Sequence, residues 1–322
     1  MTAGQWRPTA TFATLERRAA ALAAIRDFFR ARRVLEVETP ALVHSAVTDV
    51  NLTSVRVEEP GHGTLYLQTS PEYAMKRLLA AGSGDIYQVC RVFRGAERGR
   101  QHNPEFTMLE WYRLGFSLED LMREVGDIAR LVLGESAPTV GDEYVSYRDA
   151  VREHAGFDPF GDIAPIRAAA QALGLDGERA TRAGRDELLD LVVGAKVGPA
   201  LGRNRLTFLH RYPASQAALA RLDPDDARVA LRFELYLGGV ELANGYHELT
   251  SVDEQRARFA SDRQNRATRA LPAHAADAHL LAALDAGLPD CSGVALGFDR
   301  LLMLAVGAER IDDVIAFPVE RA

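Results

Sequence analysis

Residue types that bind nucleotides are concentrated in one stretch of the chain, Asp85 to Arg113. Arg94 can give a phosphate group two parallel hydrogen bonds, because its guanidinium is planar and forked. Phe106 can lie flat against a purine ring, and His102 stands in the polar loop between these two residues. The combination predicts a nucleotide site. The alternative, from these residues alone, is a surface hairpin whose arginines are only solvated.

Two acidic residues, Glu241 and Glu248, occur in one short segment near the middle of the C-terminal half. Their odd spacing would put them on opposite sides of a regular strand. A β-bulge at Asn244-Gly245 would bring them to the same side, and a second hairpin turn there would place them across from each other. Like charges that close favour a cation between them, and Mg²⁺ prefers oxygen ligands. The pair predicts a magnesium site, with two exposed acids in a loose segment as the alternative.

Another candidate is Glu72, in the triplet Ser70-Pro71-Glu72. The triplet has the features of a helix start: a capping hydroxyl, a proline at the first helical position and an acid in the first turn. Glu72 therefore either complements the helix dipole or binds an ammonium group. The residues by themselves leave both interpretations open.

Glycine and arginine residues near the C-terminus form a further candidate site. Gly293 and Gly297 allow close approach of the backbone to other groups. Arg300 lies in the first turn of a predicted helix, where a cation is unfavourable. An anionic ligand or a salt bridge would compensate for that position.

The elements expected to position these residues are helices interspersed with short strands. Alternating apolar and polar residues predict two antiparallel strands, Ile86–Arg94 and Phe106–Tyr112, on either side of the polar loop. Helical spacing and capping residues predict helices over Leu15–Arg32, Glu72–Ala81, Leu118–Leu133 and Asp299–Val306. Further strands are expected at Val34–Thr39, Val50–Val57, Thr64–Gln68, Leu206–His210, Ala230–Leu237 and in a short segment at the C-terminal end. Gly238-Gly239 predicts a hairpin turn, and Ser117 with Asp120 a capping box.

The segment from Gly141 to about Arg205 differs in character from the rest of the chain. Short helical patterns, Tyr147–His154, Pro165–Leu173 and Arg185–Val193, are broken there by glycine and proline. We interpret the segment as a helical insertion within a single domain that covers residues 1–322. No internal repeat or long linker marks a boundary.

Composition indicates a large globular protein. The chain has 322 residues, 47% of them hydrophobic and 26% charged, which is enough for a sizeable core. A net charge of −7 argues against a broad nucleic-acid surface. The N-terminus lacks the apolar core of a signal peptide, and no apolar run is long enough to span a bilayer. We therefore expect a cytoplasmic protein, without a membrane partner, in which Cys90 and Cys291 serve packing.

Three separated segments together resemble the catalytic domain of class II aminoacyl-tRNA synthetases, in the lysyl-tRNA synthetase branch. The predicted first helix and strand up to Pro40 are similar to the first motif of that family, FRGAERGRQHNPEFTMLEWY to the second and GVALGFDRLLML to the third. The resemblance implies an α+β fold, an antiparallel sheet flanked by helices. It also implies a homodimer built on the first motif.

The same resemblance implies roles for individual residues. Arg94 would bind the α-phosphate, and Phe106 and Arg300 would lie on the two sides of adenine. The resemblance assigns the catalytic roles to Arg94 and Arg300. ATP would be bound by Arg94, Gly95, Ala96, His102, Asn103, Phe106, Glu241, Leu242, Gly297 and Arg300. The amino acid would be bound by Ser70, Pro71, Glu72, Tyr112, Asn244, Glu248 and Ala295, with Glu110 as a further candidate. Glu241 and Glu248 would hold Mg²⁺.

The sequence departs from the usual pattern of lysyl-tRNA synthetases at several places, which bear on the substrate that we expect. The catalytic pattern begins almost at Met1, which leaves no anticodon-binding domain. Ala295 and Ser70 stand where the family usually has glycine and alanine, and both would reshape the amino-acid pocket. Ala96 stands where the second motif commonly has an acid, and Glu97 follows it. A misfit of one methylene group in a pocket discriminates between substrates by only ~1 to 3 kcal/mol, so these changes alter the substrate preference.

A lysyl-tRNA synthetase core with these changes is similar to the truncated paralogues that modify elongation factor P. That resemblance implies activation of (R)-β-lysine by ATP and its transfer to the ε-amino group of one lysine of elongation factor P. Acylation of tRNA is not expected. The alternatives are a stand-alone core that acylates tRNA or makes diadenosine polyphosphates, and a module that senses an amino acid or nucleotide without chemistry.

Overall fold

The computed structural model describes residues 6–322. The chain folds into two compact units. The first unit comprises the residues up to Ala137 together with Glu248–Ala322, and the second comprises Pro138–His247. The expectation of a single domain with an insertion over residues 141–205 remains a prediction.

The first unit is built on a mixed sheet of the strands β1 (Leu35–Glu36), β5 (Ile86–Phe93), β6 (Glu105–Leu114) and β11 (Cys291–Gly297), side by side in that order. β1 is parallel to β5, whereas β5, β6 and β11 pair antiparallel. The antiparallel hairpin predicted for the central stretch is therefore confirmed. Because most of β6 is buried, its side chains on both faces pack against other elements.

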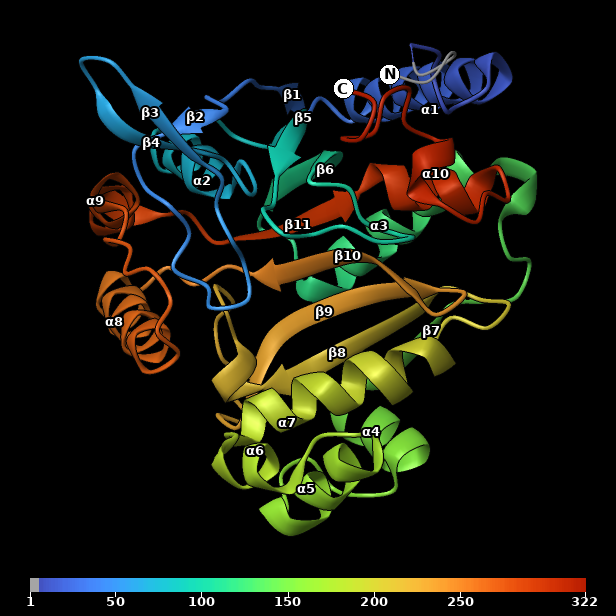
Figure 1. The fold of residues 1–322 in the computed structure, drawn as a ribbon. Helices are drawn as coiled ribbons and strands as arrows, with labels where there is room; N and C mark the ends of the chain where they lie inside the picture. Colours follow the sequence, from blue (N-terminus) through green and yellow to red (C-terminus); the bar gives the residue numbers. More distant parts are fainter. Residues whose placement is uncertain (1–5) are drawn as a thin grey trace. The chain divides into compact units, whose positions relative to one another are not determined.

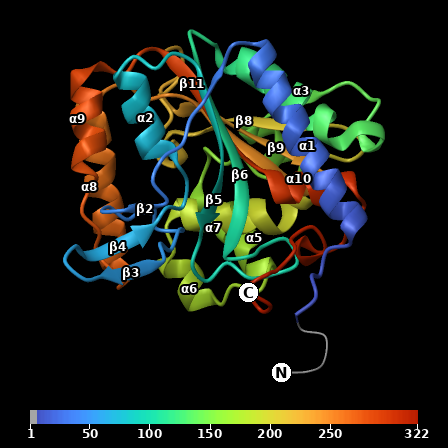
Figure 2. The ribbon, with the colours of Figure 1, turned by 90° about the horizontal axis from the view of Figure 1, so that it is seen from above.

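Helices lie on both sides of this sheet. Figure 2 shows α1 (Phe12–Ala31) and α10 (Phe298–Ala305) on one side of β5 and β6, and α2 (Glu72–Ala80) on the other. α3 (Leu118–Leu133) packs against α1 and α10 and begins at the predicted capping box of Ser117 and Asp120. The fold class expected from the sequence, α+β with a class II synthetase-like sheet flanked by helices, is confirmed.

Two helices near the C-terminal end of the chain were not predicted. α8 (Val252–Thr268) and α9 (Ala278–Gly287) pack against each other, and α9 also packs against α2 (Figures 1 and 2). Of the residues in α8, Gln255, Phe259 and Arg266 are buried, so this helix carries only a weak apolar stripe. A small sheet beside α2 consists of β2 (Leu42–Val43), β4 (Gly63–Leu67) and β3 (Arg56–Glu59) in that order.

The second unit contains β10 (Val240–His247), β9 (Val229–Leu237), β8 (Thr207–Pro213) and β7 (Glu143–Ser146), in that order. β7 is parallel to β8, and the other neighbours are antiparallel. Gly238 and Gly239 connect β9 to β10 with φ angles of 59° and 74°. Two successive positive φ angles are what a tight hairpin turn requires, so the predicted turn is confirmed.

Helices cover one side of the strands in the second unit (Figure 1). They are α4 (Tyr147–Ala155), α5 (Ile163–Ala172), α6 (Gly177–Arg182) and α7 (Arg185–Val192). Their buried apolar residues share one core with side chains of β8 and β9, among them Tyr147, Ile166, Leu189, Leu209 and Tyr236. Short helical turns occur at Gly134–Ser136, Val193–Val197, Gly198–Ala200, Ala214–Gln216 and Ile311–Asp313.

Three local predictions are wrong. α2 begins at Glu72 with Pro71 as its N-cap and no side-chain cap hydrogen bond from the described residues, so Ser70 does not cap it. The strand expected at Val50–Val57 is reduced to β3, because residues 50–55 form turn and coil before it. The final strand is absent from the described chain after α10, where the backbone forms the turn Ile311–Asp313 and then runs into Pro318.

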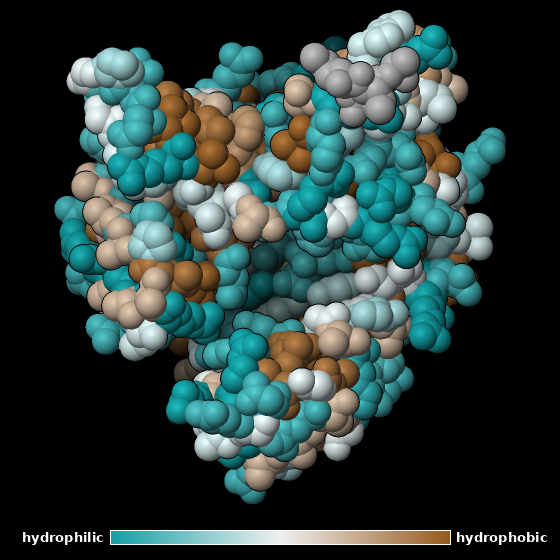
Figure 3. Space-filling model, in the orientation of Figure 1, coloured by the Kyte–Doolittle hydropathy of each residue, from teal (hydrophilic) through white to brown (hydrophobic). Residues whose placement is uncertain are grey.

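The face drawn in Figure 3 is mostly hydrophilic, with apolar residues in small separate groups. Within residues 6–322, no helix combines the length and the apolar character needed to cross a membrane.

Candidate active site

Arg94 and Phe106 lie together at one end of the β5–β6 hairpin. Phe106 pairs with Val92 in the β-ladder, and Arg94 directly follows β5. The guanidinium carbon of Arg94 is 5.3 Å from the centre of the Phe106 ring, and Arg94 Nε donates to the Thr69 carbonyl at 3.5 Å. The structure thus places a guanidinium next to an aromatic ring. The roles of Arg94 and Phe106 in binding ATP remain predictions.

Arg300 and His102 form the next part of this end of the site. Arg300 Nη2 lies 2.5 Å from His102 Nε2, and Arg300 Nε donates to the Gln101 carbonyl at 3.2 Å. Burial, followed by the charge of Arg300, lowers the pKa of His102 below its ordinary value of 6.5. A neutral imidazole can accept a hydrogen bond from the guanidinium, and its side chain holds Arg300 against the loop.

Asp299, beside Arg300, fixes the start of α10 to the sheet. It is 1% exposed, accepts a hydrogen bond from the Thr107 backbone N–H at 2.7 Å and pairs with Arg18 Nη1 at 2.5 Å. Arg18 Nη2 also donates to the Thr107 hydroxyl at 2.6 Å. This buried network joins α1, β6 and α10. Sequence reasoning missed it, although an acid at the first turn of a helix was a usable signal.

The predicted nucleotide loop is attached to the C-terminal segment. Arg98 pairs with Asp312, at 2.9 Å from Nη1 to Oδ1, and with Glu320, at 2.6 Å from Nη2 to Oε2. The side chain of Asn103 donates to the Glu105 carbonyl at 2.6 Å and accepts from the Val319 N–H at 3.2 Å. Asn103 is therefore engaged within the protein, and its role as a nucleotide ligand remains a prediction.

Gly95 and Ala96 form the turn after β5. The Gly95 N–H donates to the Thr53 carbonyl at 2.8 Å, and a Cβ at Gly95 would lie 3.1 Å from Thr53 Cγ2. Ala96 has a φ of 63°, in the left-handed region that few residues adopt without cost. This strained turn directs the backbone away from β5 beside Arg94.

A second group of charged side chains consists of Lys76 and Glu72 on α2 and Glu248, which follows β10. Lys76, on α2, lies with its Nζ 2.7 Å from Glu72 Oε1 and 2.6 Å from Glu248 Oε2. The side chains of Lys76 and Glu248 are 3% and 1% exposed, and that of Glu72 is 16% exposed. Burial alone lowers the pKa of Lys76, but the charges of Glu248 and Glu72 outweigh it, so the net shift is upward. Lys76 is therefore an ammonium ion at neutral pH.

Glu110 and Tyr112 project from β6 into the same cluster. The Tyr112 hydroxyl donates to Glu110 Oε1 at 2.7 Å, whereas Glu110 Oε2 has no hydrogen-bond partner among the described residues. Burial, and then the charge of Glu72, raise the pKa of Glu110 well above its ordinary value. The β-ladder places Glu110 opposite Gln88 on one side and Ala295 on the other. A largely buried acidic cluster is therefore present beside the sheet.

Gly293, which has no side chain, leaves room for two side chains of this acidic cluster. A Cβ built on Gly293 would lie 2.3 Å from Tyr112 Cε1 and 2.7 Å from Glu248 Oε1. Distances that short are not compatible with a side chain, so the Tyr112 ring and the Glu248 carboxylate occupy the place of one. The predicted close approach at Gly293 is confirmed.

The whole chain is similar to one family of known proteins. Residues 4–321 match the model of tRNA synthetases class II (D, K and N). This chain belongs to the class II tRNA synthetase family. It is 52% identical to an elongation factor P–(R)-β-lysine ligase of Klebsiella pneumoniae subsp. pneumoniae, over 98% of each chain. Relatives of the same name from Pectobacterium carotovorum subsp. carotovorum and Yersinia enterocolitica are 52% and 51% identical, also over 98% of each chain.

The first unit therefore contains most residues that the class II synthetase resemblance assigns to ATP and to the amino acid. They lie on β6 and β11, on α2 and α10, and in the loops beside these elements. Pro71 is buried, and Ser70, Glu72 and Ala295 are half-buried. Gly297 is the N-cap of α10. Lys76 was missed, since a single lysine in an amphipathic helix gives no functional signal by itself. Its spacing of one helical turn from Glu72 was the available clue.

The second unit of this class II synthetase carries Glu241, Leu242 and Asn244 on β10. A register shift between Glu241 and Ala243 places the β-bulge at Leu242. The predicted bulge at Asn244-Gly245 is therefore wrong in position, because those two residues pair regularly with Glu234 and Phe233. A bulge at Leu242 still changes the parity of the strand between Glu241 and the residues that follow.

The largely buried side chain of Arg232 forms a hydrogen bond with Asn244. Arg232 Nε donates to Asn244 Oδ1 at 3.3 Å, and its Nη2 pairs with Glu234 Oε1 at 2.6 Å. The Tyr236 hydroxyl donates to the other oxygen of Glu234 at 2.7 Å. Burial by itself lowers the pKa of Arg232, but Glu234 raises it more, so the guanidinium stays charged.

Among residues 6–322, no group of three or more His, Cys, Asp or Glu side chains could hold a metal ion unaided. Proteins usually bind Mg²⁺ through one or two carboxylates together with substrate phosphates, so the carboxylate side chains of Glu241 and Glu248 are of the chemical type that this ion prefers.

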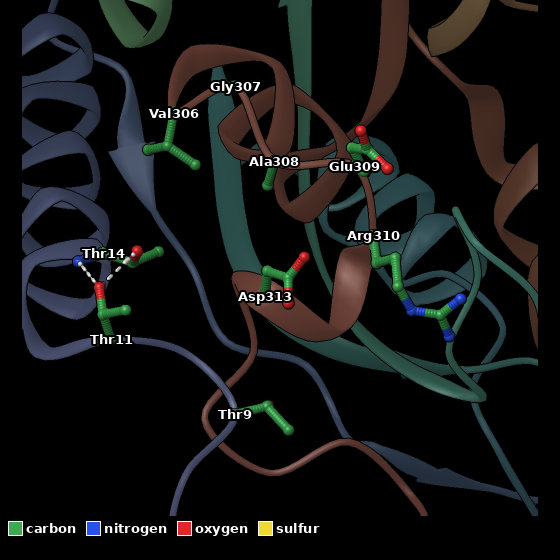
Figure 4. Close-up of a pocket in the computed structure, with 9 residues that line it drawn as sticks. All are labelled: Thr9, Thr11, Thr14, Val306, Gly307, Ala308, Glu309, Arg310 and Asp313. Carbon is green, nitrogen blue, oxygen red and sulfur yellow. Dashed lines mark hydrogen bonds between the residues drawn. The ribbon is translucent and has the colours of Figure 1, made fainter.

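A separate cavity of about 420 Å³ lies near the N-terminus of α1 and the end of α10 (Figure 4). It is lined by Thr9, Thr11, Thr14, Val306, Gly307, Ala308, Glu309, Arg310 and Asp313. None of these residues was predicted to belong to the catalytic site.

Proposed function

We propose that this protein is an ATP-dependent ligase that activates (R)-β-lysine as an adenylate and transfers it to a lysine of elongation factor P. The observation that carries the proposal is the acidic cluster of Glu72, Glu110 and Glu248, in which Glu110 lies on β6, the strand that also carries Phe106. A diamino acid brings two ammonium groups to such a cluster. The near-full-length similarity to ligases of that name supports the same reading.

In the first step, the carboxylate of the amino acid attacks the α-phosphorus of ATP, and the bond to the pyrophosphate oxygen breaks. The nucleophile is already ionised, so no catalytic base is required. Positioning and charge neutralisation then supply the rate enhancement. Arg94 would donate to the α-phosphate, Phe106 would stack under adenine, and Arg300, held by His102, would lie on the other side of the base.

In the second step, the neutral ε-amino group of the acceptor lysine attacks the carbonyl carbon of the adenylate. AMP leaves with the bonding electrons, the nitrogen loses a proton and an amide remains. Glu72, Glu248 and Tyr112 would hold the amino acid throughout, with Asn244 and Glu110 as further contacts. Ser70, Pro71 and Ala295 would shape the space around the substrate backbone.

Mg²⁺ would be held by Glu241 and Glu248 together with the phosphates of ATP, while Leu242 and Gly297 would contact the nucleotide through their backbone. When bound, Mg²⁺ neutralises phosphate charge that builds up as pyrophosphate leaves. We further propose a cytoplasmic location and a homodimer built on the first motif.

The first test compares amino acids by pyrophosphate release. We expect faster release with (R)-β-lysine than with α-lysine, and none from Glu241→Ala. Mass spectrometry of elongation factor P, after incubation with the protein, ATP and (R)-β-lysine, should then show the mass of one β-lysyl group on one lysine.

Other outcomes would point to other functions. Charging of bulk tRNA in place of elongation factor P would indicate a stand-alone synthetase. Nucleotide or amino-acid binding without turnover of any lysine isomer would leave only a sensing role.

A further inference from the structure

Lys76 occupies an unusual place for a lysine. Its side chain is 3% exposed, and its ammonium lies between the carboxylates of Glu72 and Glu248, at 2.7 and 2.6 Å. These are carboxylates to which the proposed function assigns the amino groups of the substrate. The protein thus holds one of its own ammonium groups against the acids that would receive the ammonium groups of the ligand.

The residue type is informative as well. Lys76 and Lys196 are the lysines of a chain with 38 Lys and Arg residues, so arginine supplies nearly every other cation. A guanidinium is a wide planar fork, whereas an ammonium is a compact point charge with three donors. The space between the carboxylates of Glu72 and Glu248 is occupied by the smaller of these two groups.

We propose that Lys76 is a positioning residue for the amino acid: its ammonium holds the carboxylates of Glu72 and Glu248 in the orientation that binds the amino groups of a diamino acid. This inference rests on the proposed function and extends it to a residue that does not itself react.

The charge balance of the cluster gives the physical reason. Glu72, Glu248 and Glu110 are three acids within one largely buried cluster, and Lys76 is the cation that contacts two of them. Without Lys76, the neighbouring carboxylates repel each other and move apart. That movement takes them out of position for a substrate ammonium group. Binding of ATP, which uses Arg94, Phe106 and Arg300, should change little.

Crowding around Glu248 makes its orientation critical. Its Oε1 lies where a side chain of residue 293 would be, and its Oε2 contacts Lys76. The carboxylate is therefore located by the backbone on one side and by the ammonium on the other. Removal of the ammonium leaves only the first of these restraints.

The test uses Lys76→Met, which keeps most of the side-chain volume but not the charge, and the matched control Lys196→Met, at an exposed position in the second unit. For Lys76→Met at pH 7 we expect KM for (R)-β-lysine to rise about tenfold or more, with KM for ATP within about twofold of the wild type. Lys196→Met should match the wild type.

An unchanged KM for the amino acid in folded Lys76→Met would overturn the proposal, because it would show that Lys76 only fills space. A second measurement covers a variant that fails to fold. Wild-type protein labelled with ¹⁵N and ¹³C in lysine has two side-chain signals to assign, those of Lys76 and Lys196. Saturating (R)-β-lysine should shift the Lys76 signal and leave that of Lys196 in place.

The two possible failures can be told apart. If wild-type protein does not bind or activate any lysine isomer, the proposed function fails. If the wild type is active but the Lys76 signal does not respond to the amino acid, only the role of Lys76 fails.

Discussion

Gly293 lies at a tightly packed position in the acidic cluster, where no side chain can be added without displacing a neighbour. The ring of Tyr112 and the carboxylate of Glu248 fill the space where its Cβ would be, with ring carbons at 2.3 and 2.4 Å from that position. We therefore expect Gly293→Ala to displace both side chains, to lower the free energy of unfolding by about 1–3 kcal/mol and to reduce amino-acid activation by at least tenfold. Thermal unfolding and pyrophosphate release measure the two effects.

The matched control for that change is Gly141→Ala. Gly141 is exposed, and a Cβ there would meet no atom of the described residues within 4 Å. The control should leave stability and activation unchanged. Full activity of Gly293→Ala would show that the cluster can expand, contrary to the crowding seen here.

The pair of His102 and Arg300 predicts a pH dependence. In the unfolded chain the imidazole takes up a proton near pH 6.5, but burial and Arg300 lower the pKa of His102 in the folded protein. Below pH 6.5 the unfolded chain binds more protons than the folded one, so the free energy of unfolding falls as the pH falls. Above that pH the contribution of this pair to stability is complete.

His102→Gln tests this prediction, since glutamine keeps an acceptor for Arg300 and does not titrate. Between about pH 7.5 and 5.5, the wild type should lose more stability than the variant, and its KM for ATP should rise more steeply. Equal pH dependence of the two proteins would assign the effect to other groups.

At the scale of elements, the loop between β5 and β6 depends on the C-terminal segment. Arg98 joins that loop to Asp312 and Glu320, and Arg100 O accepts a hydrogen bond from the Ile311 N–H at 2.8 Å. We expect Arg98→Ala to loosen the loop and to raise KM for ATP about fivefold, which corresponds to ~1 kcal/mol. Because these are partly exposed ion pairs, the wild type should approach the variant at high salt.

Arg100→Ala is the control from the same loop. Its side chain is 69% exposed and lies 3.6 Å from Glu309, which is itself 86% exposed. Such a pair contributes little, so KM for ATP should stay near the wild-type value. If both variants behaved alike, the attachment of the loop to the C-terminal segment would have no part in binding ATP.

Most elements could be predicted where local sequence carries its own signal. The β5–β6 hairpin, the capped helix α3 and the Gly238-Gly239 turn are each specified by alternation, a capping box or glycines with positive φ. α8 was missed because its buried face includes Gln255 and Arg266, whose burial depends on tertiary packing. Arg266, for example, donates to the carbonyls of Asp49 and Pro272. Side chains buried by distant partners give no periodic apolar pattern.

The candidate site shows the same limit at the scale of the whole molecule. Arg94, Phe106 and Glu72 could be selected from the sequence, because their types suit phosphate, purine and ammonium groups, whereas Tyr112 was assigned only through the resemblance to class II synthetases. Lys76 could not, since its function depends on Glu248, a residue far away in the sequence. The position of the bulge at Leu242 could not be predicted either, because the bulge is set by pairing with β9 and not by a local glycine.

Exposed apolar side chains make the proposed dimer testable. Phe12, at the start of α1, is 76% exposed and Leu35, on β1, is 55% exposed, and both lie in or beside the segment assigned to the first motif. The proposed dimer would cover exposed apolar side chains of this kind in its interface. We expect sedimentation equilibrium to give twice the chain mass of 35.2 kDa, and Phe12→Glu to shift the protein toward that of one chain. Val140→Glu, at a 45% exposed position in the second unit, should remain dimeric. A wild type that sediments as a single chain at micromolar concentration would contradict the dimer and leave Phe12 and Leu35 without a partner surface.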